Sequence, residues 1–226
     1  MCTLTYIPLK EKILIGSNRD EIPQRSHCEL FQMASGGIYP KEPLKGGTWI
    51  YASHHRTLVL LNGAFEKHNL KDNYSKSRGL LLLELTELNA PIAHLKSMDL
   101  DRIEPFTLVI IEQDSLEEFR WSGEDRYHKK LHSNKAHIWS SATLYSNEAQ
   151  WKRADLFKKW IQTTELHADS LWEFHTKKSD DLEDGIVIKR ANGLQTISTT
   201  QVIMHRNLNT YSFQYYDHLK NELLQV

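Results

Sequence analysis

Short apolar stretches separated by polar turns run along most of this 226-residue chain. Near its start, residues 3–8 and 12–17 have the pattern of two strands joined by a turn close to Lys10. A second hairpin is expected over 48–52 and 57–61. The later of these runs, Thr-Leu-Val-Leu-Leu, is apolar throughout, which is typical of a strand covered on both faces.

Helical spacing of apolar residues appears in two places along the chain. Residues 74–88 and 90–98 form the first pair of expected helices, and residues 147–163 and 168–175 form the second. We place Ala154, Phe157 and Ile161 on the buried side of the third helix. The remaining expected elements are strands over 106–112, 116–122, 127–131, 137–140, 186–189, 195–205 and 210–216, and a short closing helix from residue 218.

The order of these elements is strands, two helices, strands, two helices, strands. Strands and helices that are segregated in this way favour an α+β fold over a βαβ winding. We expect a four-layer αββα sandwich, in which two antiparallel sheets are flanked by helices. No repeat or linker interrupts residues 1–226, so a single domain is predicted. Residues 21–47 contain three prolines and two Gly-Gly pairs and are expected to be a long loop beside a site.

Composition narrows the classes of function. The formal net charge of -1 gives no basic face for nucleic acid. No apolar run approaches the roughly 20 residues of a membrane span, and no secretory signal precedes Cys2. Two cysteines, Cys2 and Cys28, are too few for a disulfide framework, which favours a reducing, cytoplasmic location. The composition predicts no particular oligomeric state.

The Met-Cys start of the chain carries the first candidate chemistry. If Met1 is removed, Cys2 has both a thiol nucleophile and a free α-amine, which can act as the general base for that thiol. A retained Met1 disables this base, because the amine is then part of a peptide bond. The alternative is that Cys2 is an ordinary residue at the start of a strand.

The second candidate lies where the second strand is expected to end, at Asn18, Arg19, Asp20 and Glu21. An arginine and two carboxylates there can lower the pKa of a thiol, hold an amine or bind a polar substrate. A solvated turn with a local ion pair explains the same residues. A hairpin between the first two strands would bring Cys2 beside residues 18–20.

Several motifs together now indicate a family: Met-Cys-Thr at the start, Asn-Arg-Asp-Glu at 18–21, Gly-Gly-Thr-Trp at 46–49, Ser-Arg-Gly at 77–79 and Ser-Thr-Thr at 198–200. In this order the chain resembles the NRDE family, also called the transport and Golgi organisation family. That family is grouped with the amino-terminal nucleophile (Ntn) hydrolases, and the resemblance therefore implies their αββα fold.

The resemblance also implies roles for residues. The branch with bile-salt hydrolases and penicillin V acylases cleaves amide bonds with an amino-terminal cysteine, and this implies catalytic roles for Cys2, Arg19 and Asp20. Asn62, followed by Gly63, resembles the position of an oxyanion-hole asparagine, although Asn-Gly also favours a plain turn. Ala142 stands where relatives commonly have an asparagine, so a second oxyanion donor is not expected there.

Asn18, Trp49, Gly63 and Arg78 are candidate substrate contacts, while Trp49 also fits a core position and Arg78 a surface ion pair. His54-His55 has no partner at metal-ligand spacing and fits a hairpin tip. We therefore expect no metal and no cofactor.

Two hypotheses follow for function. The first is a hydrolase or acyltransferase that acts on a non-peptide amide, with a small molecule as substrate. The second, also implied by the resemblance, is a non-catalytic binding or carrier module for lipid or haem.

Overall fold

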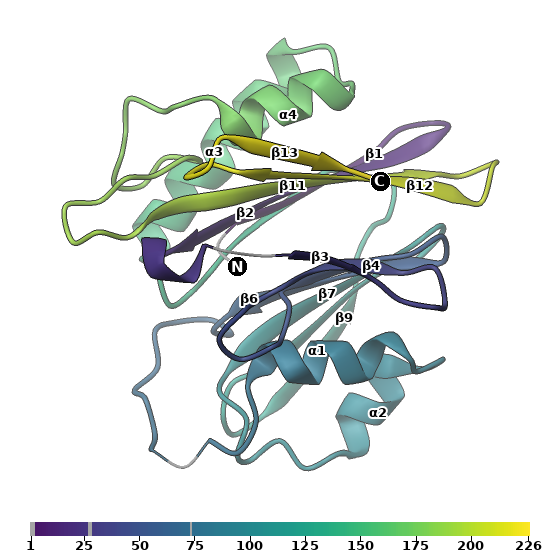
Figure 1. Cartoon of the computed structure of the whole chain (residues 1–226), viewed down its shortest axis with the longest axis vertical. Coiled ribbons are helices and arrows are strands. Elements are labelled where there is room, and N and C mark those ends of the chain that lie inside the picture. The colour runs from purple at the N-terminus through teal and green to yellow at the C-terminus, as the bar shows by residue number, and fades with distance from the viewer. Residues whose placement is uncertain (1–2, 27–28, 73) are drawn as a thin grey trace. The chain divides into compact units, whose positions relative to one another are not determined.

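The strand-rich pattern produces two antiparallel sheets in the computed structural model, which describes residues 3–26, 29–72 and 74–226 (Figure 1). The chain divides into two compact units. Unit 1 comprises Met1–Ser26, Asn134–Ser141 and Tyr145–Val226, and unit 2 comprises His27–Ser133 and Ala142–Leu144. The expected α+β class, with two antiparallel sheets and helices packed against them, is confirmed.

Unit 1 contains a six-stranded sheet in the order β10-β1-β2-β11-β12-β13. Its helices α3 and α4 contact strands β10, β2 and β11. Its elements are β1 (Thr3–Pro8), β2 (Lys12–Glu21), the short 3-10 helix η1 (Pro23–Arg25), β10 (His137–Ser140), α3 (Asn147–Thr163), α4 (Ala168–Thr176), β11 (Gln195–His205), β12 (Thr210–Asp217) and β13 (Glu222–Gln225).

Unit 2 contains a seven-stranded sheet in the order β3-β4-β5-β6-β7-β8-β9, against which α1 packs. Strands β6 and β7 are buried on both faces, as the continuous apolar run predicted. Its elements are β3 (Glu29–Gln32), β4 (Ile38–Lys41), β5 (Ile50–Ala52), β6 (Arg56–Asn62), α1 (Arg78–Thr86), α2 (Pro91–Ser97), β7 (Phe106–Glu112), β8 (Leu116–Trp121) and β9 (Arg126–Lys130).

Side chains on the sheet of unit 1 alternate between the face that carries α3 and α4 and the opposite face. Ile7 and Leu14 pack with Phe157 of α3 and Leu171 of α4, which identifies the helix-covered face. Strand β11 contains an irregularity: Thr196 pairs with Asp20, whereas Ser198 pairs with Arg19, so Ile197 is an extra residue. Because of this bulge, Thr196 and Thr199 both lie on the helix-covered face.

Two of the sequence motifs meet at the backbone of unit 2. A Cβ atom added to Gly47 would lie 2.7 Å from the carbonyl carbon of Gly79, and one added to Gly79 would lie 2.8 Å from the oxygen of Thr48. The Thr48 N–H donates to the Gly79 oxygen at 3.2 Å. Glycine at both positions therefore allows the start of α1 to approach the Gly-Gly-Thr-Trp segment. Ser77 caps the helix by accepting from the Leu80 N–H.

The structure corrects four expectations about elements. Strand β2 runs through Asn-Arg-Asp-Glu to Glu21, because β11 pairs with it along its whole length, so this tetrapeptide is not a turn. The expected loop over 21–47 contains η1, β3 and β4. Residues 186–189 form no strand and have only one isolated bridge, from Lys189 to Gln195. The chain closes with β13 and not with a helix, because residues 222–225 pair with β12.

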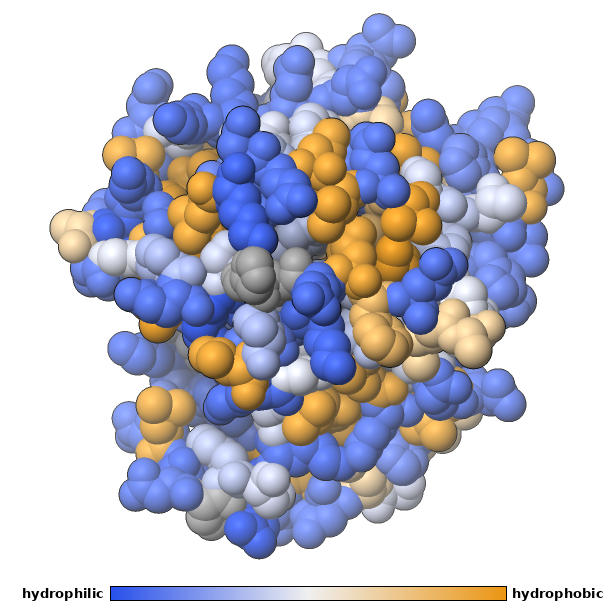
Figure 2. All heavy atoms as spheres, viewed as in Figure 1, coloured by the Kyte–Doolittle hydropathy of each residue, from blue (hydrophilic) through white to orange (hydrophobic). Residues whose placement is uncertain are grey.

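The visible surface is mainly hydrophilic, with hydrophobic residues in several groups between the polar ones (Figure 2). None of the helices in the described part of the chain is long and apolar enough to cross a membrane.

Candidate active site

Asp20 lies near the end of β2 with both carboxylate oxygens hydrogen-bonded. Its Oδ2 accepts from the Tyr145 hydroxyl at 2.6 Å, and its Oδ1 accepts from the Thr196 hydroxyl at 2.6 Å. The residue is only 3% exposed. Two hydroxyl donors in a buried setting fix the position of this carboxylate. The bulge in β11 is what brings Thr196 to the same face as Asp20.

Asn18, two residues earlier on the same face, is fully buried and connects three elements. Its Nδ2 donates to the carbonyl oxygens of His175 and Ile186, at 3.1 and 2.9 Å. Its Oδ1 lies 3.0 Å from both His175 Nδ1 and Thr199 Oγ1. The side chain therefore uses both amide hydrogens to hold the end of α4 and the following loop against the sheet.

His175, from the end of α4, completes this buried set. Its Nε2 lies 2.7 Å from Thr5 Oγ1 and its Nδ1 3.0 Å from Asn18 Oδ1. Burial, and secondarily the positive charge of Arg153, lowers the pKa of His175 to about 3. The neutral ring then donates from Nδ1 to Asn18 and accepts the Thr5 hydroxyl at Nε2. Gly16 leaves room for this ring, since a Cβ there would lie 2.4 Å from it.

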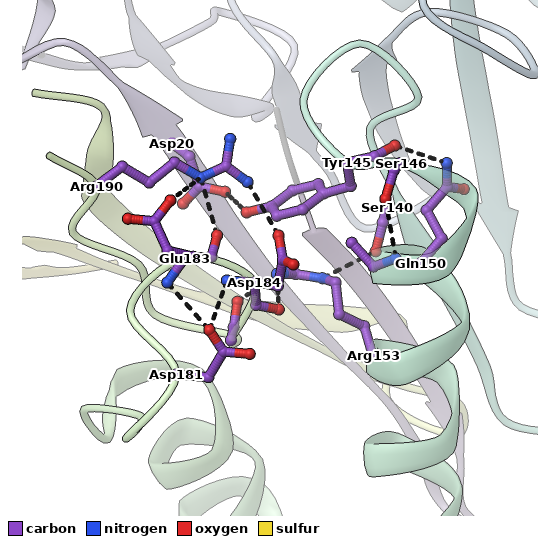
Figure 3. A network of polar contacts seen from close by, with 12 residues as sticks. Asp20, Ser140, Tyr145, Ser146, Gln150, Arg153, Asp181, Glu183, Asp184 and Arg190 are labelled. Carbon is purple, nitrogen blue, oxygen red and sulfur yellow. Dashed lines mark hydrogen bonds and ion pairs between the residues drawn. The ribbon is translucent and has the colours of Figure 1, made fainter. Parts of the chain in front are cut away.

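Arg153 of α3 lies in the polar network of Figure 3 and is 1% exposed. Its guanidinium donates to Ser140 Oγ at 3.0 Å, to the Asp184 oxygen at 3.1 Å, and to the Gly185 oxygen and Thr3 Oγ1. The centre of the guanidinium also stacks 3.9 Å from the centroid of the Tyr145 ring. Arg153 thus ties the first described residue of β1 to α3 and to the loop before β11.

Arg190 approaches the other side of the same network. Its guanidinium centre lies 5.1 Å from the Tyr145 ring, and its Nε donates to the Glu183 oxygen at 2.8 Å (Figure 3). The ring of Tyr145 is therefore near two guanidinium groups while its hydroxyl serves Asp20. This arrangement keeps charge of both signs in one buried region.

The predicted nucleophile, Cys2, lies outside the described residues. Thr3, which follows it in the sequence, pairs with Asn18 on one side and with Ser140 on the other. Arg19 points to the face opposite Asp20, and its Nη1 donates to the Arg25 oxygen at 2.7 Å. The predicted hairpin therefore brings the start of β1 beside residue 18.

The other predicted site residues belong to unit 2. Asn62 is the last residue of β6 and pairs with Phe106. Gly63 has φ +80, its N–H donates to the Pro105 oxygen at 3.0 Å, and a Cβ there would lie 3.0 Å from Thr143. The backbone N–H of Gly63 is thus used within unit 2.

Trp49 and Arg78 are both held within unit 2. Trp49 is 5% exposed, which fits the core interpretation. Arg78, at the start of α1, forms an ion pair with Glu104 at 3.0 Å and donates to the Pro105 oxygen at 2.9 Å. His54 and His55 occupy the turn between β5 and β6. Among the residues that the structure describes, no group of three or more His, Cys, Asp and Glu could hold a metal.

Sequence reasoning missed Tyr145, Arg153, Thr196 and His175. For Arg153 a signal was present: it lies four residues from both Ala149 and Phe157, on the stripe that α3 buries. Ala154, which we expected on that stripe, is exposed. A charged residue at a buried helical spacing indicates a polar network, and this was the signal available in the sequence.

Three comparisons with known proteins bear on identity. No curated protein matches the chain. Among solved structures, the chain is similar to Thiobacillus denitrificans BPH in complex with epoxomicin, with 10% sequence identity over 91% of this chain and 99% of that chain. The TM-score is 0.37, and a likeness of that size does not establish a function. The family model described as Transport and Golgi organisation 2 matches residues 1–220. That match spans nearly the whole sequence, and the chain therefore belongs to the Transport and Golgi organisation 2 family.

Proposed function

We propose that this protein is a hydrolase or acyltransferase that acts on a non-peptide amide, with Cys2 as an amino-terminal nucleophile. After removal of Met1, the Cys2 thiol would attack the amide carbonyl, and the α-amine would carry the proton from the thiol to the leaving amine. The resulting thioester would be cleaved by water or transferred to another amine. The kinship with Ntn hydrolases that the family resemblance implies supports this reaction class.

One observation carries the proposal. The strand that begins directly after Cys2 is the second strand of its sheet, and its first described residue pairs with Asn18 and Ser140 and is bound by Arg153. The buried guanidinium of Arg153, which donates to Thr3 Oγ1, fixes the position of this end of β1. The contacts that hold Thr3 in place support a function for the residue that precedes it.

Within the proposal, Asp20 orients the α-amine and Arg19 favours the thiolate. The roles of Asn62 as an oxyanion donor and of Asn18, Trp49, Gly63 and Arg78 as substrate contacts stay predictions from the sequence. The substrate is a small molecule, and we propose a cytoplasmic location because two cysteines are too few for a disulfide framework, which favours a reducing compartment.

The test starts from protein whose intact mass confirms the loss of Met1. Turnover is measured with a series of N-acyl 4-nitroanilides from acetyl to dodecanoyl. We expect Cys2→Ala to reduce turnover to background with an unchanged melting temperature, and Cys28→Ala, the matched control, to retain it. Equal turnover in Cys2→Ala and the unsubstituted protein would exclude Cys2 as the nucleophile.

A binding or carrier role is the second candidate, and the family description, with its reference to transport, favours it. On this view Met1 is retained and the protein binds lipid or haem without chemistry. Titration with haem would then give a Soret band that weakens in Cys2→Ala or His54→Ala. A mass that includes Met1 in protein from its native host would favour this candidate, whereas a mass without Met1 would favour the enzyme.

A further inference from the structure

The longest connection within unit 2 joins β6 to α1, and an open cavity of about 170 Å³ lies beside it. The cavity is lined by residues of three segments: this connection, the loop before β7 and the turn between β8 and β9. All three segments belong to unit 2. The residues proposed above for catalysis and substrate binding are not among the described residues that line the cavity. Long connections in a compact unit often carry a function, so this cavity is a candidate binding site of its own.

Contacts between the three segments hold the walls of the cavity in place. The Ser75 N–H, in the connection before α1, donates to the Arg102 oxygen at 2.9 Å. In the turn after β8, Gly123 has φ +99, and a Cβ added there would lie 3.3 Å from Pro105 Cγ. The loop before β7 therefore contacts both of its neighbours, and the cavity is part of the packed structure of unit 2.

His68 lies in the wall of this cavity with one ring nitrogen bound and the other not. Its Nε2 lies 3.2 Å from Glu104 Oε1, whereas its Nδ1 is buried and has no hydrogen-bond partner among the described residues. A carboxylate only accepts hydrogen bonds, so Nε2 carries the hydrogen, and the Nδ1 of a neutral ring is an acceptor. A buried acceptor without a partner costs free energy. A ligand that supplies a donor from the cavity would remove this cost.

The charges of the lining residues favour a ligand with positive charge. Asp101 and Glu124 are acidic, and Lys71 is the basic residue of opposite charge. Glu104, which lies behind the wall, is balanced by its ion pair with Arg78 at 3.0 Å. An ammonium group combines the N–H donors and the positive charge that these surroundings favour.

The size and the apolar part of the lining limit the rest of the ligand. Ile103, Pro105 and the aromatic residue Tyr74 belong to the lining. A cavity of about 150 Å³ can hold one benzene molecule, so about 170 Å³ suits a ligand of about six non-hydrogen atoms. A short aliphatic chain on the ammonium group fits both the volume and the apolar residues.

We propose that this cavity of unit 2 binds a small primary amine. The ammonium group of the ligand donates to His68 Nδ1 beside the two acidic residues, and the aliphatic part packs against the apolar residues of the lining. Lys71 offers a contact for a carboxylate, so free amino acids and plain amines belong to the same ligand class. The site goes beyond the proposed function, since binding here needs no catalytic cysteine.

The first experiment uses three probes that differ by one group each. They are isoamylamine, L-leucine, which is isoamylamine with an added carboxylate, and 4-methylpentanoate, which is L-leucine without its amine. Each is titrated into the full chain at pH 8 and followed by NMR, including the ¹⁵N signals of the His68 ring. We expect isoamylamine to bind with a Kd on the order of 1 mM, the strength usual for so few atoms, and to move the Nδ1 signal. We expect 4-methylpentanoate to bind at least about tenfold more weakly. Tighter binding of L-leucine than of isoamylamine assigns an amino acid as the ligand, and equal or weaker binding assigns a plain amine.

The second experiment tests His68 with a matched control. In His68→Gln the side-chain amide can still donate to Glu104, but nothing replaces Nδ1. We expect this variant to bind isoamylamine about tenfold more weakly, the effect of one hydrogen bond, with an unchanged melting temperature. His128→Gln is the control, because His128 pairs in the same way with Glu117 of unit 2 but does not line the cavity. Its affinity should be unchanged.

Asp101→Asn is a second variant that tests the charge of the lining. Asp101 is exposed, so the substitution should leave the fold intact. We expect it to weaken isoamylamine binding about threefold and to reduce the dependence of binding on salt.

Equal affinity for isoamylamine in His68→Gln, Asp101→Asn and the unsubstituted protein would mean that the amine binds elsewhere, and would overturn the proposal. Binding of 4-methylpentanoate as tight as that of isoamylamine would overturn it as well. The same holds if neither isoamylamine nor L-leucine shows saturable binding at concentrations well above the expected Kd.

Discussion

At the scale of single residues, unit 1 buries a neutral histidine among hydrogen-bonding partners. In His175, both ring nitrogens are bound by Thr5 and Asn18, while burial, and secondarily the positive charge of Arg153, opposes protonation of the ring. Sequence alone gave no reason to choose this histidine among twelve. Two features of the fold give this histidine its partners and its space. The strand register sets Asn18 beside Thr199, and Gly16 leaves room for the ring.

We expect His175 to make stability depend on pH. Its pKa is about 3 in the folded protein and 6.5 in an unfolded chain, so between these values the unfolded chain binds a proton that the folded one does not. Stability is therefore fully present above pH 6.5 and falls by about 1.4 kcal/mol for each pH unit below it. Urea unfolding at pH 7, 6, 5 and 4 measures this slope.

His175→Gln serves as the control, because glutamine keeps a polar group but cannot be protonated in this range. The variant should be less stable at pH 7 and should have a shallower slope between pH 6 and 4. Identical slopes in both proteins would show that other groups dominate the acid response.

At the scale of elements, the close contact of two motifs fixes how α1 begins. Gly79→Ala has two opposing effects: alanine favours the helix by about 1 kcal/mol, while its Cβ would lie 2.8 Å from the Thr48 oxygen and 2.9 Å from its nitrogen. Both contacts are with backbone atoms, which cannot rotate away. The steric cost of about 1–3 kcal/mol should therefore exceed the gain in helix propensity.

We therefore predict that Gly79→Ala lowers the free energy of unfolding by about 1 kcal/mol in urea melts, the middle of a net range of about 0–2 kcal/mol. Leu80→Ala, at the next position of α1, is 38% exposed and should change stability by no more than about 0.5 kcal/mol. A Gly79→Ala protein as stable as the unsubstituted one would show that the helix can shift without cost.

At the scale of the whole molecule, the chain crosses between the two units four times. Residues 134–141 belong to unit 1, the next three residues belong to unit 2, and Tyr145 returns to unit 1. Within unit 2, Ala142 and Thr143 lie close to Gly63, where an added Cβ would come within 3.2 and 3.0 Å of them. A single domain stays a prediction from the sequence.

We expect urea unfolding to show one transition, with coincident midpoints by tryptophan fluorescence and by far-ultraviolet circular dichroism. Gly63→Ala, which strains a residue at φ +80, should lower both midpoints together. Two separate transitions would contradict the single-domain prediction.

Much of the fold followed from local pattern, whereas much of the site did not. Apolar spacing predicted β6, β7, α3 and α4. The spacing of buried residues in these elements can be read within each segment, without knowing which segment packs against it. Asn-Arg-Asp-Glu was expected where the second strand ends, but β2 continues through it because it pairs with β11, which lies roughly 180 residues away in the sequence. Pairing over such distances leaves no mark on either segment alone.

The extra residue in β11 has a consequence for evolution and engineering. Ile197 shifts the alternation of the strand by one position, so Thr196 serves Asp20 while Thr199 serves Asn18. Removing or adding one residue anywhere between them would exchange every later side chain between the two faces. Substitutions can therefore change the side chains of β11 during evolution or design. An insertion or deletion between Thr196 and Thr199 would instead separate Asp20 or Asn18 from its hydroxyl partner.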